Sequence, residues 1–426
     1  MHLTSQPTAN VTIAATADTA QLACTTTLTF TTGNWNHDQD VTCTANDDKV
    51  AESTTVVPIS FAAASADANY QGVHVDTVYA TVEDNDIGDK VTVVGGANAI
   101  QQAISLSKLN FPTDGTASGV VVARDDLAVD VFTGTSYNVA SNSPVLLVKT
   151  KALPREVLDE VDRVLGPNKG KPVVLAGGTA AVSSAVEDAL KLHGYTNVKR
   201  FNGATRRATA LLFAQGLDAF NEKPATKLVV ADDRSLVDAL SMAPVASQFE
   251  DHVADPILIS TRGADAVDPA IVDYLHAHGT ITDVELVGGP QALTTGFESN
   301  LKQQFPQLTV TRTAGADRFA TNLAVLEAHF TQPRTLAVAR GDTAGIPGST
   351  TVSASVTPPT LYTALLASGF VSRLQGPVVL VRKTSIPSGT RQYLAQHHET
   401  IDVVYVVAQP GGISATVRSD LTALTH

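Results

Sequence analysis

The first 87 residues alternate short apolar runs with polar turns. Val-Thr-Ile at 11–13, Leu-Thr-Phe at 28–30 and Val-Tyr-Ala-Thr-Val at 78–82 are rich in β-branched or aromatic residues. Turn-forming clusters such as Asn-Asp-Asp at 46–48 lie between these runs. Short strands at regular spacing are typical of a β-sandwich, so we expect an all-β domain over residues 1–87. Because its first segment resembles a domain without its opening strand, we expect it to be truncated at the N-terminus.

After residue 88 the pattern changes to continuous apolar runs that alternate with helical periodicity. The apolar runs occupy 119–123, 144–148 and 172–176, and the helical patterns occupy 154–165 and 183–192. Strands that are apolar throughout are buried on both faces, as in parallel sheets that helices cover on each side. The pattern therefore predicts an α/β architecture for the rest of the chain.

This α/β pattern repeats along the chain. Pro-Val-Leu-Leu at 144–147 recurs as Pro-Ile-Leu-Ile at 256–259 and as Pro-Val-Val-Leu at 377–380, at intervals of 112 and 121 residues. Self-similarity at a nearly fixed interval is the signature of a repeat architecture. The repeats predict three units, at 88–198, 199–310 and 311–426.

Two further motifs recur in the same order. Arg-Phe-Asn-Gly-Ala-Thr-Arg at 200–206 returns as Arg-Thr-Ala-Gly-Ala-Asp-Arg at 312–318, whereas the first unit has Val-Val-Gly-Gly-Ala-Asn-Ala at 93–99 and lacks both arginines. Gly-Gly pairs at 177–178 and 288–289 each follow a strand and precede a helix. Phosphates bind at such places in dinucleotide folds. Neither a G-x-G-x-x-G motif nor a P-loop lysine is present, so we interpret the pairs as tight turns.

These residues resemble the type 2 cell-wall-binding repeat family. Its Asp-Ala-Leu element stands at 238–240 in the second unit and weakens to Asp-Val-Phe at 130–132 and Thr-Ala-Leu at 363–365. The third unit departs most, because it has an insertion near 346–359 and lacks the Gly-Gly pair. The resemblance implies three Rossmann- or flavodoxin-like units in a pseudo-threefold arrangement. It also implies non-covalent attachment to an anionic, teichoic-acid-like polysaccharide of a bacterial-type wall.

The N-terminal segment resembles a Calx-beta domain. The resemblance rests chiefly on Leu-Thr-Phe-Thr at 28–31, Asn-Trp-Asn at 34–36, Ser-Ala-Asp-Ala-Asn-Tyr at 65–70 and Asp-Asn-Asp at 84–86. It implies calcium in this domain, and carboxylates on two loops are suitable oxygen ligands. The candidate ligands are Asp47, Asp48, Glu52, Asp84 and Asp86. Alternatively, these acids only form polar turns.

Basic residues near the strand ends are the candidates for binding an anionic polymer, because open α/β sheets place ligands there and guanidinium groups suit phosphate and carboxylate. Those of the recurring turn are Arg200, Arg206, Arg207, Arg312 and Arg318, and those after the Pro-x-Leu-Leu strands include Lys149, Arg262 and Arg382. The alternative is structural: the arginines hold the turn or form salt bridges between repeats, and the others are solvated surface.

Charge and cysteine content narrow the function classes. The chain has a net charge of −13. Residues 1–87 contain one basic and eleven acidic residues, so nucleic-acid binding is disfavoured. No apolar run is long enough to span a membrane, and the sequence begins without a signal peptide. Cys24 and Cys43 are either a disulfide of an oxidising compartment or two buried thiols.

No catalytic motif stands out. Asp125-Asp126 and Asp232-Asp233 follow equivalent strands and could perform acid–base chemistry. The third unit has Gly341-Asp342 at this place, and a helix N-cap explains all three at lower cost. We therefore expect a non-catalytic, extracellular, S-layer-like surface protein with an adhesive or spacer β-sandwich, which other surface proteins could bind. Two alternatives are a calcium-stiffened structural adhesion protein with degenerate repeats and a wall-glycan enzyme on the α/β scaffold.

Overall fold

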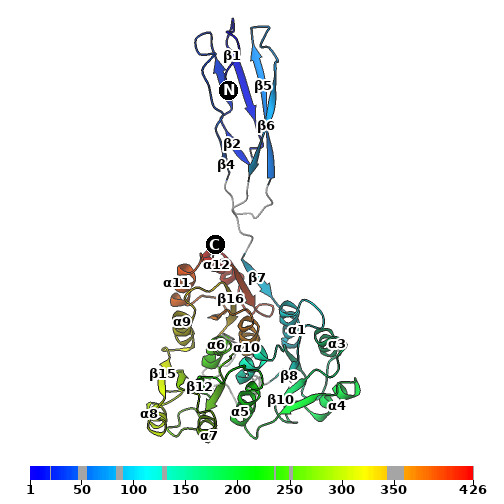
Figure 1. Ribbon diagram of the computed structural model, residues 1–426, viewed down its shortest axis with the longest axis vertical. Coiled ribbons are helices and arrows are strands. Elements are labelled where there is room, and N and C mark those ends of the chain that lie inside the picture. Colours follow the sequence, from blue (N-terminus) through cyan, green and yellow to red (C-terminus); the bar gives the residue numbers. More distant parts are fainter. Residues whose placement is uncertain are drawn as a thin grey trace. The chain divides into compact units, whose positions relative to one another are not determined.

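The computed structural model of the chain describes residues 1–19, 21–46, 55–82, 90–126, 132–234, 237–248, 253–342 and 359–425. Contacts between residues divide it into two compact units, Met1–Asp89 and Lys90–His426 (Figure 1).

The N-terminal unit contains a four-stranded antiparallel sheet, which agrees with the β-rich prediction. Its strand order is β3-β1-β5-β6, and β2 and β4 form a separate two-stranded ribbon. The bounds are β1 Val11–Thr16, β2 Leu22–Cys24, β3 Thr27–Phe30, β4 Cys43–Ala45, β5 Thr55–Ser65 and β6 His74–Val82. Alternate residues of a strand point to one face, so Val11 and Ile13 are buried with Leu28 and Phe30 of the paired β3.

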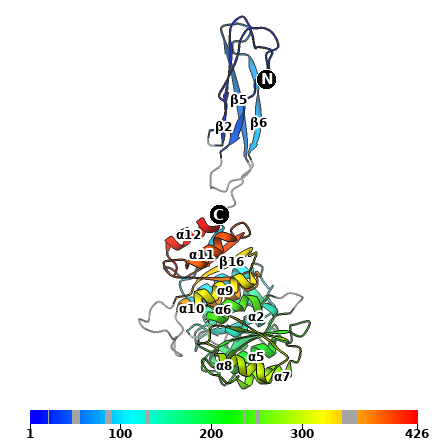
Figure 2. The same cartoon turned by 90° about the vertical axis from the view of Figure 1, so that its left-hand side faces the viewer.

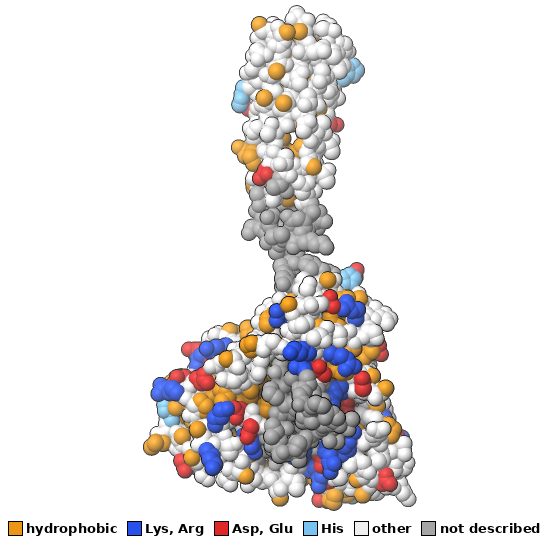
Figure 3. All heavy atoms as spheres, turned by 180° about the vertical axis from the view of Figure 1, so that it is seen from behind, with side chains coloured by type: hydrophobic (Ala, Val, Ile, Leu, Met, Phe, Trp, Pro, Cys, Tyr) orange, Lys and Arg blue, Asp and Glu red, His pale blue; other side chains and the backbone are white. Residues whose placement is uncertain are grey.

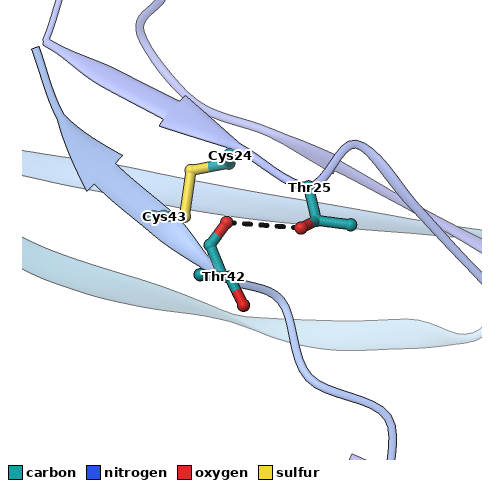
Figure 4. The surroundings of a disulfide bond; sticks show 4 residues. All are labelled: Cys24, Thr25, Thr42 and Cys43. Atoms are coloured by element: carbon teal, nitrogen blue, oxygen red, sulfur yellow. Dashed lines mark hydrogen bonds between the residues drawn. A yellow bond between two sulfur atoms is a disulfide. The ribbon is translucent and has the colours of Figure 1, made fainter.

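Cys24 and Cys43 form a disulfide in the two-stranded ribbon. They are register partners across the β2–β4 pair. Figure 4 shows the bond beside Thr25, whose hydroxyl donates to the Thr42 carbonyl at 3.4 Å. The structure thus decides between the two expectations for the cysteines in favour of the bonded pair.

The α/β unit contains three four-stranded parallel sheets with equivalent strand orders, β9-β8-β10-β11, β13-β12-β14-β15 and β17-β16-β18-β7. The strands of the first sheet are β8 Val120–Arg124, β9 Val145–Val148, β10 Val173–Ala176 and β11 Val198–Phe201. Those of the second are β12 Lys227–Asp232, β13 Ile257–Ser260, β14 Asp283–Val287 and β15 Thr309–Thr313. Those of the third are β16 Thr335–Arg340, β17 Val378–Val381, β18 Val403–Val407 and β7 Val91–Val94. The α/β prediction is therefore confirmed.

The first strand of this unit completes the last sheet. Val91–Val94 of β7 pairs in parallel with Val404–Val407 of β18. The repeat pattern placed residues 93–99 in the first unit, at 88–198, but in the structure β7 belongs to the third sheet. The limits at 198 and 310 fall within β11 and β15. Sheet membership therefore runs across the limits that the repeats predict.

Helices follow the strands in a regular order. Those after the first strand of each sheet are α2 Thr135–Ala140 (preceded by the 3-10 turn η2, Phe132–Gly134), α6 Val237–Ala246 and α10 Pro359–Ser372. Those after the second and third strands are α3 Arg155–Leu165, α7 Pro269–Ala277, α11 Ser388–Gln396, α4 Ser184–Leu192, α8 Thr295–Gln304 and α12 Ala415–Thr425. Those after the edge strands β7, β11 and β15 are α1 Ala99–Asn110, α5 Arg206–Leu217 and α9 Arg318–His329. The helices α2, α6 and α10 pack on one another (Figure 2).

Candidate functional site

Acidic and basic side chains meet at the carboxyl ends of the first and second sheets. Lys149, just after β9, pairs with Asp125, just after β8. At the equivalent place in the second sheet, Arg262 Nη1 lies 3.4 Å from Asp232 Oδ1. Lys149 remains 62% exposed despite its partner. The strand order makes this pairing local, because the first and second strands of each sheet are neighbours.

The third sheet has a different arrangement at this edge. Asp342, two residues beyond the end of β16, pairs with Arg340, the last residue of that strand. Arg382, directly after β17, lies 3.7 Å from Asp317. The Arg382 guanidinium also stacks 4.3 Å from the centre of the Phe319 ring, and its side chain is 47% exposed. All three sheets therefore carry a partly exposed cation within two residues of the end of the second strand.

Arg206 and Arg318 connect neighbouring sheets. Each is the first residue of a helix that follows an edge strand. Arg206 Nη1 donates to the carbonyl oxygen of Asp233 at 2.7 Å, and Arg318 Nη1 donates to that of Gly341 at 2.9 Å. Both carbonyls directly follow the first strand of the next sheet. Burial lowers the pKa of Arg318, and the equivalent residue of α1 is Ala99.

Arg200 and Arg312 hold the Gly-Gly turns. Arg200 Nη1 donates to the carbonyls of Gly177 and Val182 at 3.0 and 2.7 Å. Its Nη2 lies 2.8 Å from Glu187 Oε2. Arg312 repeats the arrangement with the carbonyl of Gly288 at 2.7 Å and Glu298 Oε2 at 3.0 Å. These two guanidinium groups are largely buried. Their hydrogen bonds therefore stabilise the Gly-Gly turns.

The Gly-Gly pairs use their backbone groups within the fold. The N–H groups of Gly177 and Gly288 donate to the carbonyls of Phe201 and Thr313 at 2.8 and 2.9 Å. Gly177 and Gly288 have positive φ angles of 92° and 106°. Residues other than glycine rarely adopt this backbone conformation. This geometry agrees with the tight-turn interpretation.

Sequence comparison relates the unit that carries these features to a known family. Residues 93–187 and 312–418 match the family model of cell wall binding domain 2 (CWB2). A comparison with curated proteins finds no match.

Two solved structures from Clostridium difficile share the fold. Cwp8 is 21% identical with a TM-score of 0.68, over 97% of this chain and 63% of that chain. Cwp6 is 19% identical with a TM-score of 0.66, over 99% of this chain and 64% of that chain. The chain thus spans less than two thirds of either protein.

The candidate cations are divided between the CWB2 segments and the region between them. Lys149, Arg312, Arg318 and Arg382 fall within the two matched segments. Arg200, Arg206, Arg207 and Arg262 lie in the intervening residues 188–311, which form most of the second sheet. That sheet nevertheless has the same strand order as the first. The structure therefore shows an equivalence that the CWB2 match alone does not.

Several partners of these cations, Asp268 among them, lie outside the sequence-based candidates. Arg207 Nη1 lies 2.7 Å from Asp233 Oδ2, and its Nε lies 2.8 Å from Asp268 Oδ2. Asp268 also caps the N-terminus of α7. The Ser/Asp preference of helix N-caps, together with Pro269 at the first helical position, was the signal that could have identified Asp268.

The proposed calcium ligands Asp47, Asp48, Glu52, Asp84 and Asp86 all lie outside the described residues. Within the described ranges, no group of three or more His, Cys, Asp or Glu side chains is arranged to hold a metal ion. None of the described helices is both long and apolar enough to cross a membrane.

Charge differs between the two units. The described part of the N-terminal unit contains no Lys or Arg. On the α/β unit, Lys and Arg side chains are frequent, and Asp and Glu lie among them (Figure 3). An anionic ligand would therefore find its complementary charges on the α/β unit.

Proposed function

We propose that this chain is a non-catalytic surface protein that attaches to an anionic polysaccharide of a cell wall. The match of residues 93–187 and 312–418 to CWB2 carries this proposal. The repeated exposed cation at the carboxyl ends of the sheets supports it. Similar weak sites on one chain give avidity to a repeating polymer without one strong contact.

The polymer contacts are assigned to the exposed cations Lys149, Arg262 and Arg382. Each follows the second strand of its sheet, and each retains exposed surface beside its acidic neighbour. Arg200, Arg206, Arg312 and Arg318 instead support these edges, because backbone carbonyls of the fold occupy their guanidinium groups. Arg207 is likewise held by two carboxylates.

The N-terminal unit is proposed to be a spacer or adhesive module, of the kind that could bind other surface proteins. The disulfide fits an oxidising, extracellular location. Calcium is proposed to bind the acidic segments around residues 47–52 and 84–86. Added calcium would then raise the unfolding midpoint of the N-terminal unit, and a combined Asp84→Asn and Asp86→Asn variant would lose that response.

Co-sedimentation of the full chain with isolated cell walls tests polymer attachment. We expect binding that disappears when the anionic polymer is stripped and that weakens as salt rises, since the screening length falls from ~10 Å at 0.1 M to ~3 Å at 1 M. The triple variant Lys149→Gln, Arg262→Gln and Arg382→Gln should bind about tenfold more weakly.

A matched triple variant, Lys191→Gln, Lys302→Gln and Arg334→Gln, removes three partly exposed cations away from these edges. It should bind like the unaltered chain. If the two triple variants lose wall binding equally, the polymer contacts cannot be assigned to the sheet edges. Absence of wall binding under every condition would favour a structural adhesion protein with degenerate repeats.

A further inference from the structure

A pocket lies at the opposite end of the first sheet from Lys149. It opens between the last turns of α1 and α10, the short helix α2 and the start of β9, and its empty space of about 520 Å³ includes open solvent outside the pocket. Pro144 and Val145 at the amino end of β9 line it, whereas Lys149 follows the carboxyl end of the same strand. The pocket is therefore separate from the edges proposed to bind polymer.

Three polar atoms in its walls have no hydrogen-bond partner among the described residues. They are Ser107 Oγ, Asn110 Oδ1 and Asn138 Oδ1. Ser107 and Asn138 are each only 4% exposed. Asn110 Nδ2 donates to the Phe370 carbonyl at 3.2 Å, which orients that amide. A buried polar group without a partner costs about 1–3 kcal/mol, so these atoms favour a ligand that donates hydrogen bonds.

Arg373 adds a positive charge to the pocket. Its guanidinium lies 4.3 Å from the centre of the Phe111 ring, and both residues line the pocket. Among the described residues, this ring contact is the one interaction that the Arg373 side chain makes. Burial alone lowers the pKa of Arg373, with no carboxylate contributing. An oxyanion would supply the missing counter-charge, because guanidinium binds carboxylate and phosphate.

The rest of the wall is apolar. Leu106, Val139, Leu365 and Phe370 contribute to it. Pockets of this kind, mostly apolar with a few convergent polar groups, are typical small-ligand sites. The non-polar faces of a sugar ring suit such walls, and its hydroxyls suit the two amide oxygens.

We propose that this pocket binds a small hydroxylated oxyanion, of the chemical class of acidic monosaccharide units. Its carboxylate or phosphate contacts Arg373, and its hydroxyls donate to Asn110 and Asn138. Ser107 completes the site, since its hydroxyl both donates and accepts. The ligand is either a free molecule or a terminal residue of a wall polysaccharide.

Gly369 provides a variant that fills the pocket. It lines the pocket from α10, and a Cβ built on it meets no atom within 4 Å. Glycine inside a helix is less stable than alanine by roughly 0.5–1 kcal/mol. Gly369→Leu, whose Cβ has room, should therefore place its side chain in the pocket and block the site.

Ligand-observed NMR and calorimetry on the full chain test the proposal, with glucuronate and glucose 1-phosphate as anionic probes and glucose as the neutral one. At least one anion should bind more tightly than glucose. Arg373→Gln should weaken its binding about tenfold or more, and Gly369→Leu should abolish it. The control Lys108→Gln, which removes an exposed cation of α1 outside the pocket, should leave binding unchanged.

The proposal is overturned if neither anion binds the unaltered chain, if glucose binds as tightly as the anions, or if Gly369→Leu retains full binding. Wall sedimentation of Gly369→Leu then identifies the source of the ligand. A loss of wall binding assigns the pocket to a polymer terminus, and unchanged wall binding assigns it to a free molecule. Anion binding that survives in the Lys149, Arg262 and Arg382 triple variant separates this site from the sheet edges.

Discussion

Arg318, the first residue of α9, donates a hydrogen bond to the carbonyl of Gly341 just beyond β16. The contact joins a helix that follows the second sheet to the first strand of the third. Arg206 forms the same contact with Asp233 one sheet earlier. Arg206 and Arg318, which the sequence offered as ligand contacts, thus connect neighbouring sheets instead.

Replacing Arg318 should destabilise the α/β unit. Arg318→Ala removes a charged donor and leaves the buried Gly341 carbonyl without this partner, so we expect a loss of about 1.5–3 kcal/mol. Urea unfolding followed by circular dichroism measures this change. Arg334→Ala, which removes an exposed guanidinium paired with Asp402, should cost less than about 1 kcal/mol. Equal costs for the two variants would argue against the inter-sheet role.

Asp255 should make the α/β unit less stable as pH rises. Burial raises the pKa of Asp255 to about 7 from 3.8, with Glu285 and Asp283 also contributing. Between these values the folded state keeps a proton that the unfolded state has released, so stability falls from about pH 4 to pH 7 and then levels off. Asp255→Asn should remove this slope, so that its stability relative to the unaltered chain rises by about 2–3 kcal/mol between pH 5 and pH 8. Denaturation at both pH values measures it, and parallel profiles for the two proteins would contradict the prediction.

The disulfide should stabilise the N-terminal unit alone. Cys24 and Cys43 are 19 residues apart, and closing a loop of this size contributes roughly 3 kcal/mol through the unfolded chain. A double Cys24→Ser and Cys43→Ser variant should lose about that much in the thermal transition of the N-terminal unit. The transition of the α/β unit should stay in place and serve as the internal control. A shift of both transitions would show that the two units do not unfold independently.

Gly376 and Gly369 should respond oppositely to alanine. A Cβ at Gly376 would lie 2.0 Å from the backbone carbonyl oxygen of Thr335, so Gly376→Ala must displace main chain. We expect a cost of about 2 kcal/mol or more. Gly369→Ala enters open space and should stabilise by about 0.5–1 kcal/mol. Paired calorimetric scans of the two variants provide the comparison, and a stabilising Gly376→Ala would refute the close approach.

The sequence predicted the positions of helices and strands better than it predicted which strands pair with one another. The amphipathic pattern at 154–165 corresponds to α3, Arg155–Leu165, and the apolar run at 172–176 contains β10, because local periodicity determines both. Placement of β7 required long-range information: its motif at 93–99 aligns with the recurring turns, but motif order cannot show which sheet a strand joins. The pairing of Cys24 with Cys43 likewise depends on the β2–β4 register.

The candidate site was predicted in part. Cations after the second strands follow from the Pro-x-Leu-Leu motif, and the structure places Lys149 and Arg262 beside Asp125 and Asp232. The sequence leaves open whether Arg200 and Arg312 hold the turns or face a ligand, because it does not show which carbonyls a guanidinium group reaches. The pocket could not be predicted, since Ser107, Asn138 and Arg373 come from distant parts of the chain.

The pairing of β7 with β18 has a consequence for how the α/β unit is made. Val91 is the register partner of Val404, so β7 cannot pair within its sheet until a strand more than 300 residues later in the sequence has been synthesised. Contacts at such separation slow folding. During synthesis, this strand emerges long before its partner and must avoid pairing with other strands in the meantime. Loss of β18 would therefore also leave β7 without its partner in the sheet. A shorter chain that ends before the third sheet would not be a simple two-sheet version of this unit.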